Sequence, residues 1–389
     1  MNIKKGVIMK NFKSQKSILI YIFTLLFSVV FITTGYKMNK QELNLENKAK
    51  SYRATVISIE EIKEEEIDYG YEKMSAKTIR FTAEIKNSSE SKKVEAFQFI
   101  DEAIEVNPKQ IDVGDDILIS ELSSRTNVEE LEWTFIEYYR TDSLIMIISA
   151  FFILLVLFCR KKGINTIISL VITCLSIFLV FIPSILNGRN IYFSSVIICI
   201  FIIFTSLFII NGAHKKTLCA IIGNLGGLAA AGILSYFIGN SLNLTGLIDQ
   251  DSMFLLMINP ESPIDLKAIL WSSIVIGSLG AVMDISMSIA SATNELAENI
   301  ENKSFKVFLR SGLNIGQDSI GTMTNTLVLA YIGSSLSIVL LMMVYNSDFI
   351  QLINLEMIVF EILQAIIGSM GILLAIPITS LFSAYIFSK

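Results

Sequence analysis

The sequence carries little charge and almost no histidine. Only 17% of its 389 residues are charged, and a single histidine is present. Soluble domains carry about 25% charged residues, so the low charge excludes a soluble globular protein as the main class. The 52% hydrophobic content also excludes a disordered chain. A single histidine removes most His-dependent chemistry, His-rich zinc sites above all. The four cysteines lie in or beside apolar runs and indicate no disulfide framework.

Motifs for enzymatic chemistry are missing as well. The sequence has no P-loop, no Rossmann glycine fingerprint and no metal-ligand cysteine pair. His214 stands alone in a short polar stretch, so a nucleophile activated by histidine is not expected. We predict no enzymatic activity and no cofactor, and we assign no metal site. An intramembrane aspartyl enzyme is a weaker alternative, because the G-x-G-D and Y-D contexts that would support it are absent.

The charges that are present are unevenly distributed. Residues 37–142 contain 24 acidic and 15 basic residues, whereas the rest of the chain contains 12 acidic and 16 basic residues. This division indicates two solvents, water for residues 37–142 and lipid for most of the remainder. The acidic balance of residues 37–142 would repel phosphate, so no nucleic acid partner is expected.

Apolar runs of about 18 or more residues predict membrane-spanning helices. The sequence contains eight of them, and the expected class is therefore an α-helical polytopic membrane protein. The runs cover residues 17–35, 143–159, 164–186, 191–210, 217–239, 266–290, 320–345 and 357–387.

Basic residues in the short connections predict the orientation of these spans. One set of flanks holds 14 Lys and Arg, and the opposite set holds only Arg189 and Lys267. Both termini are thus expected in the cytoplasm. The predicted segments are a cytoplasmic basic tail (1–16), a first span (17–36), an extracytoplasmic domain (37–142) and a membrane domain of seven helices (143–389). No A-x-A-like cleavage pattern follows the first span, so we expect an uncleaved signal anchor, and cleavage would leave seven spans.

The extracytoplasmic domain is expected to be rich in β-structure. Alternating or β-branched segments separated by polar turns predict four or five short strands, near residues 53–59, 78–85, 94–100, 113–119 and 134–139. Such a series in about 90 residues is typical of a small barrel or sandwich of the OB or SH3-like kind. The acidic run 60–66 is expected to form a solvated hairpin loop.

Ionisable residues within spanning helices are costly and usually face a partner or a cavity. Asp284 and Ser288 lie four residues apart in the run 266–290, on one face of a helix that Gly277 and Gly280 continue. These glycines, with Gly321 in the next run, are expected to allow close helix packing.

A second polar face follows at the same kind of spacing. Asn314, Asp318, Thr322 and Asn325 lie at helical intervals, and the two faces are joined by residues 295–317. We expect this connector to be an amphipathic helix on the cytoplasmic surface. The two faces together are the candidate binding site for a solute or ion, with a structural role in tying the two helix ends together as the alternative.

Longer motifs around these faces resemble the YibE/F-like family of bacterial multi-pass membrane proteins. The motifs are residues 277–291 (GSLGAVMDISMSIAS), 310–327 (RSGLNIGQDSIGTMTNTL) and 330–336 (AYIGSSL), with 138–140 and 215–218 as shorter matches. The resemblance runs from about residue 50 to the end of the chain. One departure is Gln317, where a basic residue is expected. The family's function is uncharacterised, so the resemblance implies a bacterial cytoplasmic-membrane location and suggests transport only by default.

Two functions follow from these observations. The leading hypothesis is a permease or exporter of a small solute or ion, with its polar site between the sixth and seventh spans. The alternative is a non-transporting component, an assembly factor, partner subunit or envelope sensor that acts through the external domain. The expected partners are the lipid bilayer, an unknown small solute or ion, and a membrane protein partner or a second copy of the chain.

Overall fold

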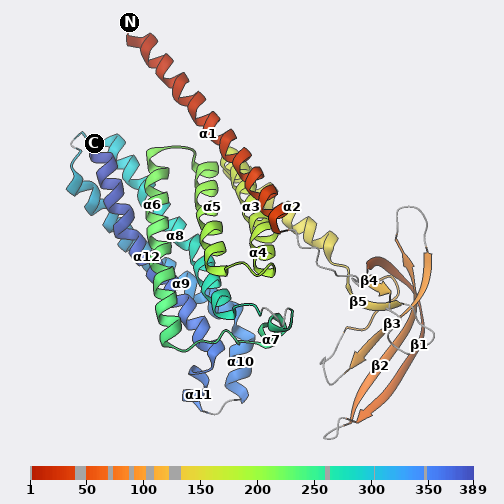
Figure 1. Cartoon of the computed structure of the whole chain (residues 1–389). Coiled ribbons are helices and arrows are strands. Elements are labelled where there is room, and N and C mark those ends of the chain that lie inside the picture. The colour runs from red at the N-terminus through yellow and green to blue at the C-terminus, as the bar shows by residue number, and fades with distance from the viewer. Residues whose placement is uncertain are drawn as a thin grey trace. The chain divides into compact units, whose positions relative to one another are not determined.

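The computed structural model describes residues 2–39, 50–68, 73–86, 92–101, 109–121, 133–258, 263–301, 303–345 and 348–389. Within this part of the chain there are two compact units. One is formed by residues 42–154 and contains the strands. The other is formed by residues 1–41 and 155–389 and is helical (Figure 1).

The first unit contains a closed five-stranded barrel. Its strands follow the order β1-β2-β3-β5-β4, with β4 pairing back onto β1 and a single parallel pair between β3 and β5. This is the strand order of the OB fold, one of the two barrels that the sequence predicts. The strands are β1 (Ser51–Asp68), β2 (Lys73–Ile85), β3 (Lys92–Asp101), β4 (Asp116–Glu121) and β5 (Trp133–Tyr138).

The alternation of side chains along the strands builds the barrel core. On β2, Ile79, Phe81, Ala83 and Ile85 are buried at every second position, because successive side chains of a strand point to opposite faces. The prediction of a solvated hairpin loop at 60–66 is wrong. These residues belong to β1, which pairs with β2 in register as far as Asp68 opposite Lys73. The cross-strand partners supply the physical reason, since Lys77 forms an ion pair of 3.1 Å with Glu64.

The second unit is a bundle centred on three long helices. Helices α6 (Lys215–Ser241), α8 (Leu266–Asn299) and α12 (Glu356–Ser388) pack against one another, and α9 (Phe305–Ser334) packs mainly on α12. Helix α5 (Ile191–Asn211) packs on α3, α6 and α8. The other elements that lie wholly in this unit are α1 (Asn2–Asn39), α3 (Lys161–Ser176), the π-helical turn η1 (Ile177–Phe181), α4 (Ile182–Leu186), α7 (Gln250–Met257), α10 (Leu336–Tyr345) and α11 (Phe349–Ile353).

Seven helices of the described residues are long and apolar enough to cross a membrane. They are Ile18–Asn39, Thr141–Cys159 (α2), Lys161–Leu186, Ile191–Asn211, Lys215–Ser241, Leu266–Asn299 and Glu356–Ser388. The eighth predicted run, 320–345, is not among them. It is divided between α9 and α10, with a turn at Ser335, and the part in α9 is rich in polar residues.

The connector 295–317 differs from its prediction. It is not a separate surface helix, because α8 continues to Asn299 and α9 begins at Phe305. Most of the predicted connector therefore forms the ends of two long helices. The alternation of charged and apolar residues there reflects two helices that each have one packed and one exposed side.

Candidate functional site

Helix α9 lies along α12 for most of its length. A Cβ added to Gly312 would lie 2.7 Å from Ser380 Oγ, and one added to Gly316 would lie 2.9 Å from Ile376 Cγ1. Near the other end, Leu327 Cδ1 lies 3.4 Å from the corresponding position of Gly368. The two helices are therefore antiparallel neighbours, and α9 runs side by side with the apolar α12.

The face of α9 that points away from α12 is polar. Phe308, Gly312 and Gly316 are buried on the packed side. The predicted site residues of this helix, all exposed on the other side, are Asn314, Asp318, Thr322 and Asn325. Gln317 is exposed beside them. The helical spacing seen in the sequence thus marks a real face, and the packing shows that this face points outward from the bundle.

Helix α8 presents its predicted residues in the same manner. Asp284 and Ser288 are exposed on α8, and their neighbours Ile285 and Ile289 are fully buried. At Gly277 an added Cβ would lie 3.0 Å from Tyr331 Oη of α9. Because α8 and α9 are antiparallel, counting from this contact places Asp284 level with residues 324–325. Asp318 lies six residues further along α9, or about 9 Å along the axis at a rise of 1.5 Å per residue.

The two carboxylates have no protein partner within the described residues. Neither Asp284 nor Asp318 forms a hydrogen bond or an ion pair there. The described residues also contain no group of three or more Asp, Glu, His or Cys side chains that could hold a metal ion. Both acids are thus available to a mobile ion, to water or to another protein chain.

The predicted packing glycines divide into two kinds. Gly277 faces Tyr331 and the Gln364 amide, whose Nε2 lies 3.1 Å from its added Cβ. At Gly280 and Gly321 an added Cβ would meet nothing within 4 Å. Close packing by these two glycines within the described chain is therefore wrong, because both lie on the exposed faces of their helices.

Sequence reasoning missed a set of polar side chains inside the bundle. Asn224 of α6 is fully buried, and neither its Oδ1 nor its Nδ2 has a hydrogen-bond partner in the described structure. Around the α6–α8–α12 contact, the hydroxyl oxygens of Thr379 and Ser286 lie 3.4 Å apart. Ser380 and Ser383 are buried on α12 as well, with unpartnered hydroxyl groups. The asparagine in the middle of the apolar run 217–239 is the sequence feature that could have predicted this buried polar set.

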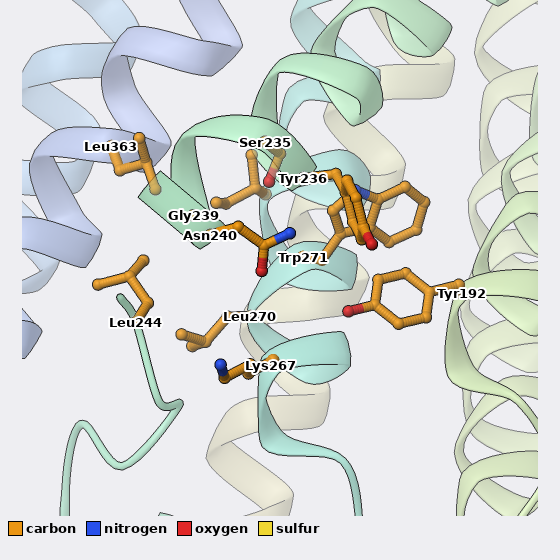
Figure 2. A pocket seen from close by; sticks show the side chains of 11 residues that line it. Tyr192, Ser235, Tyr236, Gly239, Asn240, Leu244, Lys267, Leu270, Trp271 and Leu363 are labelled. Atoms are coloured by element: carbon orange, nitrogen blue, oxygen red, sulfur yellow. The ribbon is translucent and has the colours of Figure 1, made fainter. Parts of the chain in front are cut away.

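A small cavity lies at the end of the bundle where α6 ends and α8 begins. It has a volume of about 30 Å³, which is room for about one or two water molecules. Figure 2 shows Tyr192 from α5 and Tyr236 from α6 gathered around Trp271 of α8, with Lys267 one turn earlier on α8. The Trp271 indole donates to Gly232 O at 2.8 Å, which fixes the ring against α6.

A charged cluster connects the barrel to the start of α2. The Arg53 guanidinium lies 2.6 Å from Asp116 and 2.9 Å from Asp142, and it stacks over the Tyr139 ring at 4.0 Å. Desolvation of Asp116 opposes its ionisation. However, hydrogen bonds from Arg53, Thr55 and Lys86 outweigh this effect and hold the pKa of Asp116 below its ordinary value. Arg53, Lys86, Asp116 and Asp142 each have a partner of opposite charge, so we assign this cluster a structural role.

The long apolar helices packed into a bundle fit a membrane protein. A family model described as YibE/F-like protein matches residues 147–389, and the chain belongs to this family. The match starts within α2 and includes both polar faces, but it does not include the barrel. No curated protein and no solved structure matches the chain significantly.

Proposed function

We propose that this protein is a permease or exporter of a small solute or ion, with its path lined by the outward faces of α8 and α9. The observation that supports this proposal is the polar face of α9 beside the apolar α12. A helix at membrane depth with exposed amide, hydroxyl and carboxylate groups is costly in lipid, because such groups lack hydrogen-bond partners there. A water-filled path along this face removes that cost.

The spacing of the carboxylates specifies how the path works. Asp284 and Asp318 are separated by about 9 Å along the helix axes, too far for both to ligate one small cation. They act as two successive positions for a cation or a proton. Asn314, Thr322 and Asn325 supply neutral oxygen ligands between and beside them, which suit cations with oxygen coordination.

The proposed topology counts α9 as a span. With the seven apolar helices this makes eight, and it places both termini in the cytoplasm and the barrel outside. The support is the excess of Lys and Arg at one set of helix ends, where Lys303, Lys306 and Arg310 are exposed between α8 and the first turns of α9.

Reconstituted protein tests the transport proposal. Proteoliposomes carrying a pH-sensitive dye or a Na⁺- or K⁺-sensitive dye are compared for the wild type, Asp284→Asn and Asp318→Asn. Each substitution is expected to lower the flux by roughly tenfold or more, since 1.4 kcal/mol of lost ion binding is a factor of ten. Asp251→Asn is the matched control, because Asp251 is an exposed acid on α7. Undiminished flux in both variants would reject these residues as the path.

A second candidate function is a non-transporting assembly or sensing component. The same exposed face of α9 supports it, because a helix of a partner protein would cover the polar groups as well as water does. This function predicts that a cellular phenotype survives Asp284→Asn and Asp318→Asn but is lost when residues 51–140 are removed. A permease predicts the opposite dependence on the two aspartates.

A further inference from the structure

Beside the cavity of Figure 2, a larger apolar groove lies on the outside of the bundle. The groove has a volume of about 460 Å³ and is bounded by α5, α6 and α8. Tyr192, Tyr236 and Trp271 line both spaces. These three aromatic residues border a polar space, the cavity, and a long apolar space, the groove, which we call the polar end and the apolar end of this surface.

The apolar end is open to the lipid and matches a hydrocarbon chain. Leu228, Ile233 and Val275 are among its walls, and almost all of its surface is hydrophobic. Its volume falls within the range of about 300–1,000 Å³ that is usual for ligand sites. Ala229 and Gly232 also line the groove, and they leave space in it because alanine has a small side chain and glycine has none.

The polar end carries one positive charge. Lys267 lines the cavity with the Asn240 amide and the Tyr192 hydroxyl, and it forms no ion pair within the described residues. The nearby acid, Asp265, accepts a hydrogen bond from Ala268 N at 3.1 Å and so caps the first turn of α8. The carboxylate of Asp265 is therefore held by the N-terminus of α8. The ammonium group of Lys267 remains free to pair with a ligand.

The aromatic residues locate this surface at the edge of the membrane. Tyr192 lies 5.1 Å from Trp271 and 6.2 Å from Tyr236 between ring centroids. Trp and Tyr concentrate at membrane–water interfaces, and lysine reaches from there to the phosphate level. A phospholipid in this leaflet would meet the apolar groove with an acyl chain and Lys267 with its headgroup.

We propose that the α5–α6–α8 groove binds an anionic phospholipid, with one acyl chain between Trp271 and Val275 and the headgroup phosphate at Lys267 and Asn240. This lipid site is separate from the exposed faces of α8 and α9. The lipid-binding proposal can therefore be tested independently of the transport proposal. Anionic lipid is the occupant that the free positive charge selects over a zwitterionic one.

Fluorescence of Trp271 measures this binding directly. The chain has two tryptophans, and Trp133→Phe leaves Trp271 as the only emitter. This full-length variant is reconstituted in phosphatidylcholine vesicles that contain either phosphatidylglycerol or phosphatidylcholine with a brominated acyl chain. Brominated phosphatidylglycerol is expected to quench Trp271 at about fivefold lower mole fraction, the preference that one lysine supplies near a membrane surface.

Two further variants tie the quenching to the groove. Lys267→Gln is expected to remove the headgroup preference, and Lys216→Gln, a matched change at the opposite end of α6, is expected to leave it intact. Ala229→Phe fills the groove and is expected to lower quenching by both lipids, with unchanged helical circular dichroism as the check on folding. Equal quenching by the two headgroups in the parent protein would overturn the proposal.

Discussion

Gly223 of α6 and Thr379 of α12 lie at the closest contact between these two central helices. A Cβ added to Gly223 would lie 2.8 Å from Thr379 Cβ and well inside the contact distance of its Oγ1. Thr379 cannot easily move, because its hydroxyl donates to Ala375 O at 2.7 Å and is fully buried. The approach of α6 to α12 therefore depends on the absence of a side chain at Gly223.

The first prediction is that Gly223→Ala destabilises the helical bundle. Forcing a methyl group into a packed core costs about 1–3 kcal/mol, so the thermal midpoint in detergent should fall when followed by circular dichroism. Gly280→Ala is the matched control, because its added Cβ meets nothing within 4 Å. Equal thermal midpoints for the two variants would show that α6 and α12 can move apart without loss of stability.

The buried amide of Asn224 leads to a second prediction. An unpartnered buried polar group costs about 1–3 kcal/mol, so Asn224→Leu, a change that keeps the number and branching of the side-chain heavy atoms, should raise the thermal midpoint of the bundle. Asn224→Asp should lower it, because a carboxylate would have to be buried without a partner. If Asn224→Leu unfolds the protein instead, the amide has a stabilising role that the static contacts do not account for.

The Arg53–Asp116 pair gives a prediction for the pH dependence of the barrel. The folded state lowers the pKa of Asp116 through hydrogen bonds from Arg53, Thr55 and Lys86, against the effect of desolvation. The stabilisation is therefore fully present above the ordinary aspartate pKa of about 3.9 and is lost as the pH falls toward the lowered pKa.

Trp133 reports on this loss, because it is buried in the barrel against Tyr52. In a Trp271→Phe background, the barrel's thermal midpoint should fall as the pH is lowered below about 4. Asp116→Asn should lower the midpoint at neutral pH and weaken its acid dependence. An unchanged acid dependence in Asp116→Asn would assign the acid sensitivity to other carboxylates.

The fourth prediction concerns the proposed topology. In a variant whose four cysteines are replaced by alanine, Glu95→Cys on β3 and Lys303→Cys before α9 introduce single thiols at exposed positions. A membrane-impermeant maleimide added to intact cells should label Glu95→Cys at once and Lys303→Cys only after permeabilisation. Labelling of Lys303→Cys in intact cells would reverse the proposed orientation.

Much of the local structure follows from side-chain periodicity. The alternation around Ile79 and Phe81 predicts a strand of the barrel, and long apolar runs predict most of the membrane helices. Both patterns are local, because a strand or a helix repeats its environment every two or 3.6 residues. The exception is the run 320–345, where α9 ends at Ser334 and α10 continues after a turn.

Periodicity also placed Asp318, Thr322 and Asn325 on one face of a helix, but it could not say what that face contacts. A repeat along one helix gives relative directions only. The contacts of Gly312 and Gly316 with α12 turn the opposite side inward, and this is why the polar face is exposed.

By itself, the sequence determined the membrane class, the strand-rich segment and the two polar helix faces. Only the tertiary structure decided that these faces point outward, that Asn224 is buried without a partner, and that Lys267 and Trp271 line one cavity with residues of α5 and α6. The physical reason is that burial and cavities arise from contacts between segments far apart in the chain, which no local repeat encodes.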